Sequence, residues 1–141
     1  MDELQLLDWR RRMAELFAEL RRRPPDAASL AWFRAQKDEL FSGHPQSPLP
    51  ESARAGARLS YWAFDAQARV TARFEPQPAP AVQGEVPLRR IGRLHFAYAG
   101  RELALGAFWV EGYAGGLFVP FRDETCGHET YGGGRYLLDT I

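Results

Sequence analysis

The densest run of side chains that can do chemistry lies near the end of the chain, at residues 122–135. It reads Arg122-Asp123-Glu124-Thr125-Cys126-Gly127-His128-Glu129-Thr130-Tyr131-Gly132-Gly133-Gly134-Arg135. Guanidinium groups beside open backbone N–H groups are suited to carboxylates, phosphates and other polar ligands. We therefore predict a ligand-binding site made by the two arginines, the tyrosine and the glycine backbone, namely Arg122, Tyr131, Gly132, Gly133, Gly134 and Arg135.

The same segment has a purely structural interpretation. It lies between two apolar runs, so it can be the loop of a β-hairpin with Cys126-Gly127-His128 at its tip. Gly127 is then free to take a positive φ. Three consecutive glycines mark a sharp bend, a bulge or a surface that a ligand approaches closely. The residue types leave both interpretations open.

Catalytic and metal-binding chemistry have less support in this segment. His128 with Glu129 or Asp123 is a candidate acid/base pair for a hydrolase, and Cys126 is a candidate nucleophile. A zinc-type site needs three or four ligands, and beyond Cys126 the chain has only three histidines, which are far apart in the sequence. We therefore predict no metal and no cofactor.

Two amphipathic helices are expected to precede the part of the chain that carries these residues. Apolar side chains recur at helical spacing through residues 2–22 and again through residues 26–42. Asp2 lies at the start of the first helix, and Pro24-Pro25 ends it. Asp26 can cap the second helix, and Ser42-Gly43 ends it. Each helix has one apolar face, so each needs a partner surface.

The period changes from helical to alternating near residue 59. A proline-stiffened connector, residues 44–58, comes before this change and is expected to be an ordered crossover rather than a ligand for a proline-reading domain. Ala99-Gly100 is expected to form a short hairpin turn. Alternation and apolar runs predict strands at residues 59–64, 69–74, 93–98, 102–110, 117–121 and 136–138.

These elements predict an α+β fold. We expect the N-terminal helical pair to pack on a small antiparallel β-barrel or sandwich. The chain of 141 residues fits a single domain, 1–141, with the helical pair at 1–43, the crossover at 44–58 and the antiparallel part at 59–141.

Composition argues against two classes of partner. Eighteen basic and eighteen acidic residues leave no net charge, so no positive field gathers nucleic acid. No run approaches the roughly 18 apolar residues of a membrane span.

The acidic start, Met1-Asp2-Glu3, is unlike a secretory signal, and one cysteine cannot form an internal disulfide. We predict a soluble cytoplasmic protein.

Two motifs resemble a known family. Gly116-Leu117-Phe118-Val119-Pro120-Phe121-Arg122-Asp123, followed by Glu129-Thr130-Tyr131-Gly132-Gly133-Gly134-Arg135-Tyr136-Leu137, resembles the signature of the bacterial and archaeal family called domain of unknown function 1684 (DUF1684). The segment His44-Pro45-Gln46-Ser47-Pro48-Leu49 and the helix at 32–41 resemble that family's N-terminal signature. The resemblance implies an uncharacterised soluble protein and brings no catalytic residues. It also implies a further segment after Asp139-Thr140, so the chain is expected to be a truncated product, a natural short form or a domain fragment.

Three functions follow from these observations. The first is binding of a small polar or anionic ligand by the β module, through Arg122, Tyr131, Arg135 and the glycine backbone. The alternatives are a hydrolase-like enzyme using His128 with Glu129 or Asp123, and a protein-interaction module.

An apolar strand edge can pair with a second chain, so a homodimer is also expected through the C-terminal strand at 136–138.

Overall fold

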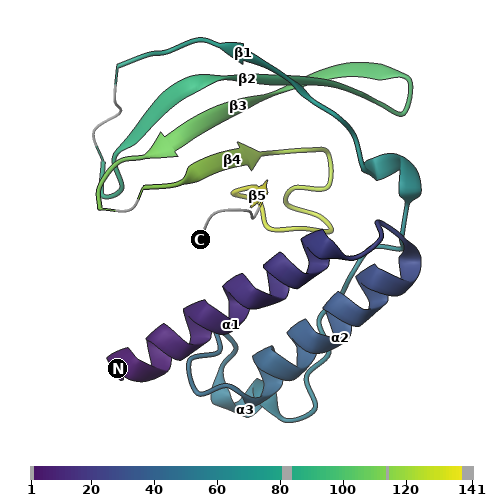
Figure 1. The fold of residues 1–141 in the computed structure, drawn as a ribbon, viewed down its shortest axis with the longest axis vertical. Helices are drawn as coiled ribbons and strands as arrows, with labels where there is room; N and C mark the ends of the chain where they lie inside the picture. Colours follow the sequence, from purple (N-terminus) through teal and green to yellow (C-terminus); the bar gives the residue numbers. More distant parts are fainter. Residues whose placement is uncertain (1, 81–83, 114, 138–141) are drawn as a thin grey trace. The chain divides into compact units, whose positions relative to one another are not determined.

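The computed structural model describes residues 2–80, 84–113 and 115–137, and its chain divides into two units, Met1–Ala66 and Gln67–Ile141. Helices occupy the first unit, and a five-stranded antiparallel sheet occupies the second (Figure 1). The predicted α+β class, with a helical pair followed by antiparallel strands, is therefore confirmed. Among the described residues, no helix combines the length and the apolar character that crossing a membrane requires.

The first unit is a helical hairpin. Helix α1 spans Glu3–Arg22 and helix α2 spans Ala27–Gly43, each within one residue of its predicted bounds. The Asp2 carboxylate accepts the backbone N–H groups of Leu4 and Gln5, and Asp26 accepts that of Ser29. Such N-caps satisfy backbone donors that have no partner within the helix. The cap predicted at Asp26 is therefore confirmed, and Asp2, which was predicted only to lie at the start of α1, is a second N-cap.

Aromatic pairs hold α1 against α2, and the two helices lie side by side in opposite directions (Figure 1). The rings of Phe17 and Phe33 lie 5.1 Å apart, and those of Trp9 and Phe41 lie 5.2 Å apart. Phe33 and Leu16 are buried. Tilted aromatic pairs at this separation add to the stabilisation that burial alone provides. The apolar stripes read from the sequence are therefore the faces that meet.

The proline-rich crossover after α2 is ordered around one arginine. The Arg54 guanidinium, at the end of the short helix α3 (Glu51–Arg54), donates to the carbonyl oxygens of Leu49, Ser47 and Pro45 at 2.8–3.1 Å. The Ser47 hydroxyl donates to the Phe41 carbonyl at 2.6 Å. These bonds fold the crossover back onto the end of α2, as the ordered-crossover interpretation predicted.

The sheet of the second unit has five strands in sequence order, so every neighbouring pair is antiparallel and β1 and β5 are its edges. Ala99, with φ 50°, and Gly100, with φ 73°, make the two-residue turn between β2 and β3. Positive φ at both positions is what a tight hairpin turn of the I′ type requires. The strands are β1 (Arg73–Pro76), β2 (Leu88–Tyr98), β3 (Arg101–Val110), β4 (Leu117–Phe121) and β5 (Arg135–Leu137).

Three expectations about the strands need correction. The sheet is open rather than closed into a barrel, because β1 and β5 lie at opposite ends of the strand order. Residues 59–64 form no strand, since the Leu59 backbone N–H donates to the Asp38 carboxylate instead of to a neighbouring strand. The predicted strand at 69–74 begins only at Arg73. Residue 138 of the predicted last strand lies outside the described residues.

Candidate functional site

A groove runs along the helical unit between α1 and α2. Its volume is about 870 Å³. Small-molecule sites are concave, about 300–1,000 Å³ in size, with an apolar surface and a few placed polar groups. The groove has both kinds of lining: Leu4, Leu16, Trp32, Leu40 and Pro45 are its apolar or aromatic residues, and Gln5, Asp8, Arg12, Glu15, Glu19, Gln36, Glu39, Gly43 and His44 complete it.

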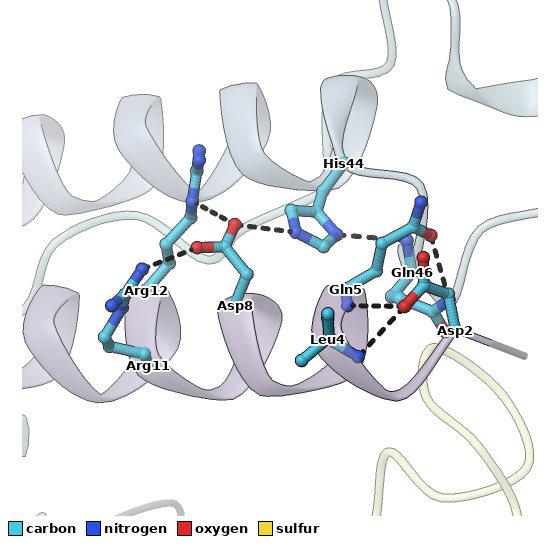
Figure 2. A network of polar contacts seen from close by, with 8 residues as sticks. All are labelled: Asp2, Leu4, Gln5, Asp8, Arg11, Arg12, His44 and Gln46. Carbon is cyan, nitrogen blue, oxygen red and sulfur yellow. Dashed lines mark hydrogen bonds and ion pairs between the residues drawn. The ribbon is translucent and has the colours of Figure 1, made fainter.

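A polar network fixes one end of this groove (Figure 2). The Asp8 carboxylate accepts from Arg11 Nη2 at 2.9 Å and from Arg12 Nε at 2.7 Å. His44 Nε2 lies 3.3 Å from Asp8 Oδ2, the oxygen that Arg12 also contacts, and the Gln46 backbone N–H donates to His44 Nδ1 at 3.0 Å. The hydrogen bond from Arg11, above all, lowers the pKa of Asp8, and partial burial opposes it.

This network fixes which ring nitrogen of His44 carries the hydrogen. Because Nδ1 accepts a backbone hydrogen bond, the ring hydrogen lies on Nε2 and faces Asp8. Only 6% of the His44 side chain is exposed, and the ring lies 5.3 Å from that of Trp9. Both ring nitrogens are thus engaged within the protein. The residue is arranged to position Asp8 and the end of α2 rather than to exchange protons with a substrate.

A second polar cluster lies on another part of α2. The buried Asp38 carboxylate accepts the Leu59 backbone N–H at 3.0 Å and the Tyr61 hydroxyl at 3.1 Å. Burial, followed by this hydrogen bond, raises the pKa of Tyr61 to about 12. The Lys37 ammonium lies over the Phe41 and Tyr61 rings, and burial lowers its pKa. The cluster secures the chain after α3 to the helical hairpin.

The loop between β4 and β5 holds the residues that the sequence singled out. Arg122 Nη2 donates to the Gly132 carbonyl at 2.9 Å, and Arg135 pairs with Asp123 while its guanidinium lies over the Phe121 ring. The side-chain hydrogen bond from Thr125, above all, lowers the pKa of Asp123. The structure thus pairs Arg122 with Gly132 and Arg135 with Asp123. Both guanidinium groups already have partners within the loop.

Three other predicted residues of this loop are exposed. Tyr131 is 79% exposed, and His128 and Glu129 are exposed at the tip. Within the described residues, no hydrogen bond or ion pair joins the His128 side chain to another group. The Cys126 thiol lies 3.9 Å from Asp123 Oδ1. The acid/base pairs proposed from the sequence are therefore not in hydrogen-bonding contact.

Two glycines of the loop have backbone roles. Gly127 has φ 82° at the tip, as predicted. Gly134 has φ 100°, and a Cβ there would lie 2.7 Å from the Phe121 carbonyl oxygen and 2.8 Å from Arg122 Cγ. An L side chain is strained at this φ and also meets backbone. Gly134 is thus required by the close approach of β5 to the end of β4.

Nothing in the described residues gathers three or more His, Cys, Asp or Glu side chains into a metal-binding group. The absence of a metal and of a cofactor remains a prediction. The groove between α1 and α2 was not predicted. A signal for it was present: Asp8, Arg12, Glu15 and Glu19 recur at steps of four, three and four, beside the apolar stripe of the same helix.

Comparison with known proteins identifies a family and a solved structure, both of unknown function. The family model described as "Protein of unknown function (DUF1684)" matches residues 56–141. No curated protein matches the chain. The solution NMR structure of the uncharacterized protein from gene locus rrnAC0354 of Haloarcula marismortui is 33% identical, with a TM-score of 0.51. That match covers 81% of this chain and 66% of the other, so this chain spans just under two thirds of that protein's length.

Proposed function

The chain belongs to the DUF1684 family of proteins of unknown function, and we propose that this member is a binding protein for a small polar molecule. The observation that carries the proposal is the groove between α1 and α2. Its volume of about 870 Å³ falls in the range of small-molecule sites, and its lining combines apolar residues with placed polar groups.

The single cysteine, Cys126, which has no partner for a disulfide within the chain, supports a cytoplasmic location.

Binding without catalysis fits the polar groups better than hydrolysis does. A general base needs a nitrogen or oxygen that is open to the substrate. Gln46 and Asp8 engage both nitrogens of His44. Hydrogen bonds and an ion pair within the loop likewise hold the Asp123 carboxylate. The hydrolase alternative, which uses His128 with Glu129 or Asp123, therefore has no assembled acid/base pair to support it.

The β4–β5 loop is the second candidate site, for an anionic group. One observation favours it: Arg135 Nε is buried and has no hydrogen-bond partner among the described residues. A carboxylate or phosphate placed there could bond this donor beside Arg122. Such a ligand would have to compete with Asp123, which already pairs with Arg135. For this reason we rank the loop below the groove.

Filling the groove should weaken binding there. Gln36 lines the groove from the middle of α2, whereas its neighbour Ala35 is exposed and does not line it. We expect Gln36→Trp to weaken the affinity for the captured ligand at least about ten-fold, because its indole occupies the ligand's volume. Ala35→Trp should keep this affinity within about two-fold of wild type, because its indole lies outside the groove. The measurement is native mass spectrometry with a mixed library of neutral, cationic and anionic small molecules.

The same library separates the two candidate sites. A ligand lost in Arg122→Gln but retained in Gln36→Trp would move the site to the loop and contradict the groove. A library from which the folded wild-type chain captures nothing at millimolar concentration would contradict the binding function as a whole.

We also propose that the chain pairs with a second copy through β5. This strand is an edge of the sheet, and Tyr136 and Leu137 on it are 49% and 52% exposed. An open apolar edge is a template for another strand, and a two-fold contact closes it. Light scattering at micromolar concentration should give about twice the mass of 16.0 kDa.

Leu137→Lys should convert the dimer to a monomer, because the ammonium would be buried without a partner. The matched control is Leu7→Lys, which changes another exposed leucine in the other unit. A wild-type mass of one chain, or a dimer unaffected by Leu137→Lys, would refute pairing through β5.

A further inference from the structure

The charge of the groove selects the ligand's charge. Among the described residues that line it, four carry carboxylates, Asp8, Glu15, Glu19 and Glu39, and a single one, Arg12, carries a guanidinium. Asp8 and the Gln46 backbone N–H occupy both ring nitrogens of His44, so this side chain has no nitrogen free for a ligand. Arginines pair with Asp8 and Glu19, whereas no ion pair in the described residues engages Glu15 or Glu39. The unpaired charge in the lining is therefore negative, and it favours a cation over an anion.

Two of the four carboxylates are available to a ligand. Asp8 is already paired with Arg11 and Arg12, and Glu19 with Arg22 and Arg23 at 3.2 Å each. Glu15 makes no hydrogen bond or ion pair with another described residue. The Glu39 carboxylate accepts only the Gln36 amide, at 3.5 Å, within the part of the chain that the structure describes. Glu15 and Glu39, one from each helix, are thus the carboxylates that a bound cation can pair with.

The acidic residues are spread along the groove rather than gathered at one point. At about 1.5 Å per residue, Asp8 and Glu15 are about 10 Å apart along α1, and Glu15 and Glu19 are about 6 Å apart. Positions separated by four, seven or eleven residues lie on nearly the same face of a helix. The apolar side chains of Leu16 and Leu40 line the same groove. The lining therefore combines separated negative charges with apolar surface over a length of two to three helical turns.

We propose that the ligand is a linear aliphatic polyamine, which carries protonated amines separated by methylene segments. This inference rests on the proposed function, since it names the ligand class of the same groove. Amines at intervals match carboxylates at intervals, and the methylene segments lie along the leucines. A compact divalent cation needs several oxygens at one point, and the described residues provide no group of three acidic or other metal-binding side chains. A single amine would use only one of the two available carboxylates.

Titration calorimetry with spermidine as the probe tests the proposal on the full chain at low ionic strength. We expect one spermidine per chain. Glu15→Gln combined with Glu39→Gln should weaken binding at least about ten-fold, because the variant removes two charge-assisted contacts without changing side-chain shape. Glu51→Gln is the matched control: Glu51 is exposed in the same unit, on α3, and does not line the groove. Its binding should stay within about two-fold of wild type.

Three outcomes overturn the polyamine assignment. They are no binding of spermidine, equal binding by the double variant and wild type, and displacement of spermidine by an equal concentration of Mg²⁺, which would indicate diffuse charge screening. The proposed function has its own readout. If the library yields a neutral or anionic ligand that Gln36→Trp excludes, the groove remains a binding site and only the polyamine assignment fails. If Gln36→Trp has no effect on any captured ligand, both fail.

Discussion

Phe33→Ala is expected to lower the free energy of unfolding of the helical unit by about 3–5 kcal/mol, the cost of removing a buried phenylalanine and leaving a cavity. Phe33 is 7% exposed, and its ring lies 5.1 Å from that of Phe17 on the facing helix. A typical domain has only about 5–15 kcal/mol of stability in total, so this variant should unfold at a much lower urea concentration than wild type.

Urea unfolding followed by tryptophan fluorescence measures this loss, because three of the four tryptophans, Trp9, Trp32 and Trp62, lie in the helical unit. Leu7→Ala is the control: Leu7 is also on the helical hairpin but is 61% exposed, so its loss should cost less than about 0.5 kcal/mol. Equal midpoints for the two variants would contradict the packing of α1 on α2 described here. Since the groove lies between the same helices, Phe33→Ala should also lose any ligand bound there.

Local signals in the sequence were sufficient for the helices and the tight turn. Asp2 and Asp26 stand where a cap must stand, and apolar residues follow at helical steps, so the bounds of α1 and α2 were predicted within one residue. The turn at Ala99-Gly100 was likewise predicted from a short break between two alternating runs. In each case the interactions that define the element lie within a few residues of one another.

The segment at 59–64 shows where local signals mislead. Its alternating aromatic residues are typical of a strand, yet Leu59 and Tyr61 bond to Asp38, more than twenty residues earlier. A strand needs a neighbouring strand to accept and donate its backbone hydrogen bonds, and the β-propensity of a segment does not show whether one is present. A single buried carboxylate on α2 was enough to give this segment a different partner.

The candidate groove was missed for a similar reason. Residues 122–135 concentrate polar side chains in the sequence, whereas the groove takes its lining from two helices and the residues that follow them. The Asp8–His44 contact joins residues 36 positions apart. In the loop, conversely, close contact with Phe121 and Arg122 explains why residue 134 is a glycine. The glycine run that suggested a ligand surface therefore has a structural cause at this position. A run of polar residues that are adjacent in the sequence therefore pointed to a hydrogen-bonded loop, whereas the residues that line the groove are distant in the sequence.

The Asp38–Tyr61 contact predicts how stability depends on pH at the alkaline end. Burial and the bond to Asp38 raise the pKa of Tyr61 to about 12, from about 10 in an unfolded chain. The folded state therefore holds the phenolic proton more tightly than the unfolded state does. The stabilisation from this group is fully present below pH 10 and is lost as the pH rises from 10 through 12. The loss should be about 1–2 kcal/mol, because solvent screens the partly exposed ring.

Tyr61→Phe isolates this effect from other groups that titrate in the same range. At pH 8 the variant should be less stable than wild type by about 1 kcal/mol, because Asp38 loses a donor. Between pH 10 and 12 wild type alone loses the Tyr61 contribution, so the difference between the two proteins should shrink toward zero. Lys37, whose pKa burial lowers, contributes with the opposite sign but equally in both proteins, and cancels in the comparison.

Urea midpoints of wild type and Tyr61→Phe at pH 8, 10, 11 and 12 provide the comparison. Tyr131→Phe is the control, since Tyr131 is 79% exposed and should follow wild type at every pH. A stability difference between wild type and Tyr61→Phe that stays constant through pH 12 would mean that the phenol is not held by Asp38. The attachment of residues 59–61 to α2 would then depend on the Leu59 N–H bond, and Asp38→Ala would be expected to cost only what that one bond contributes.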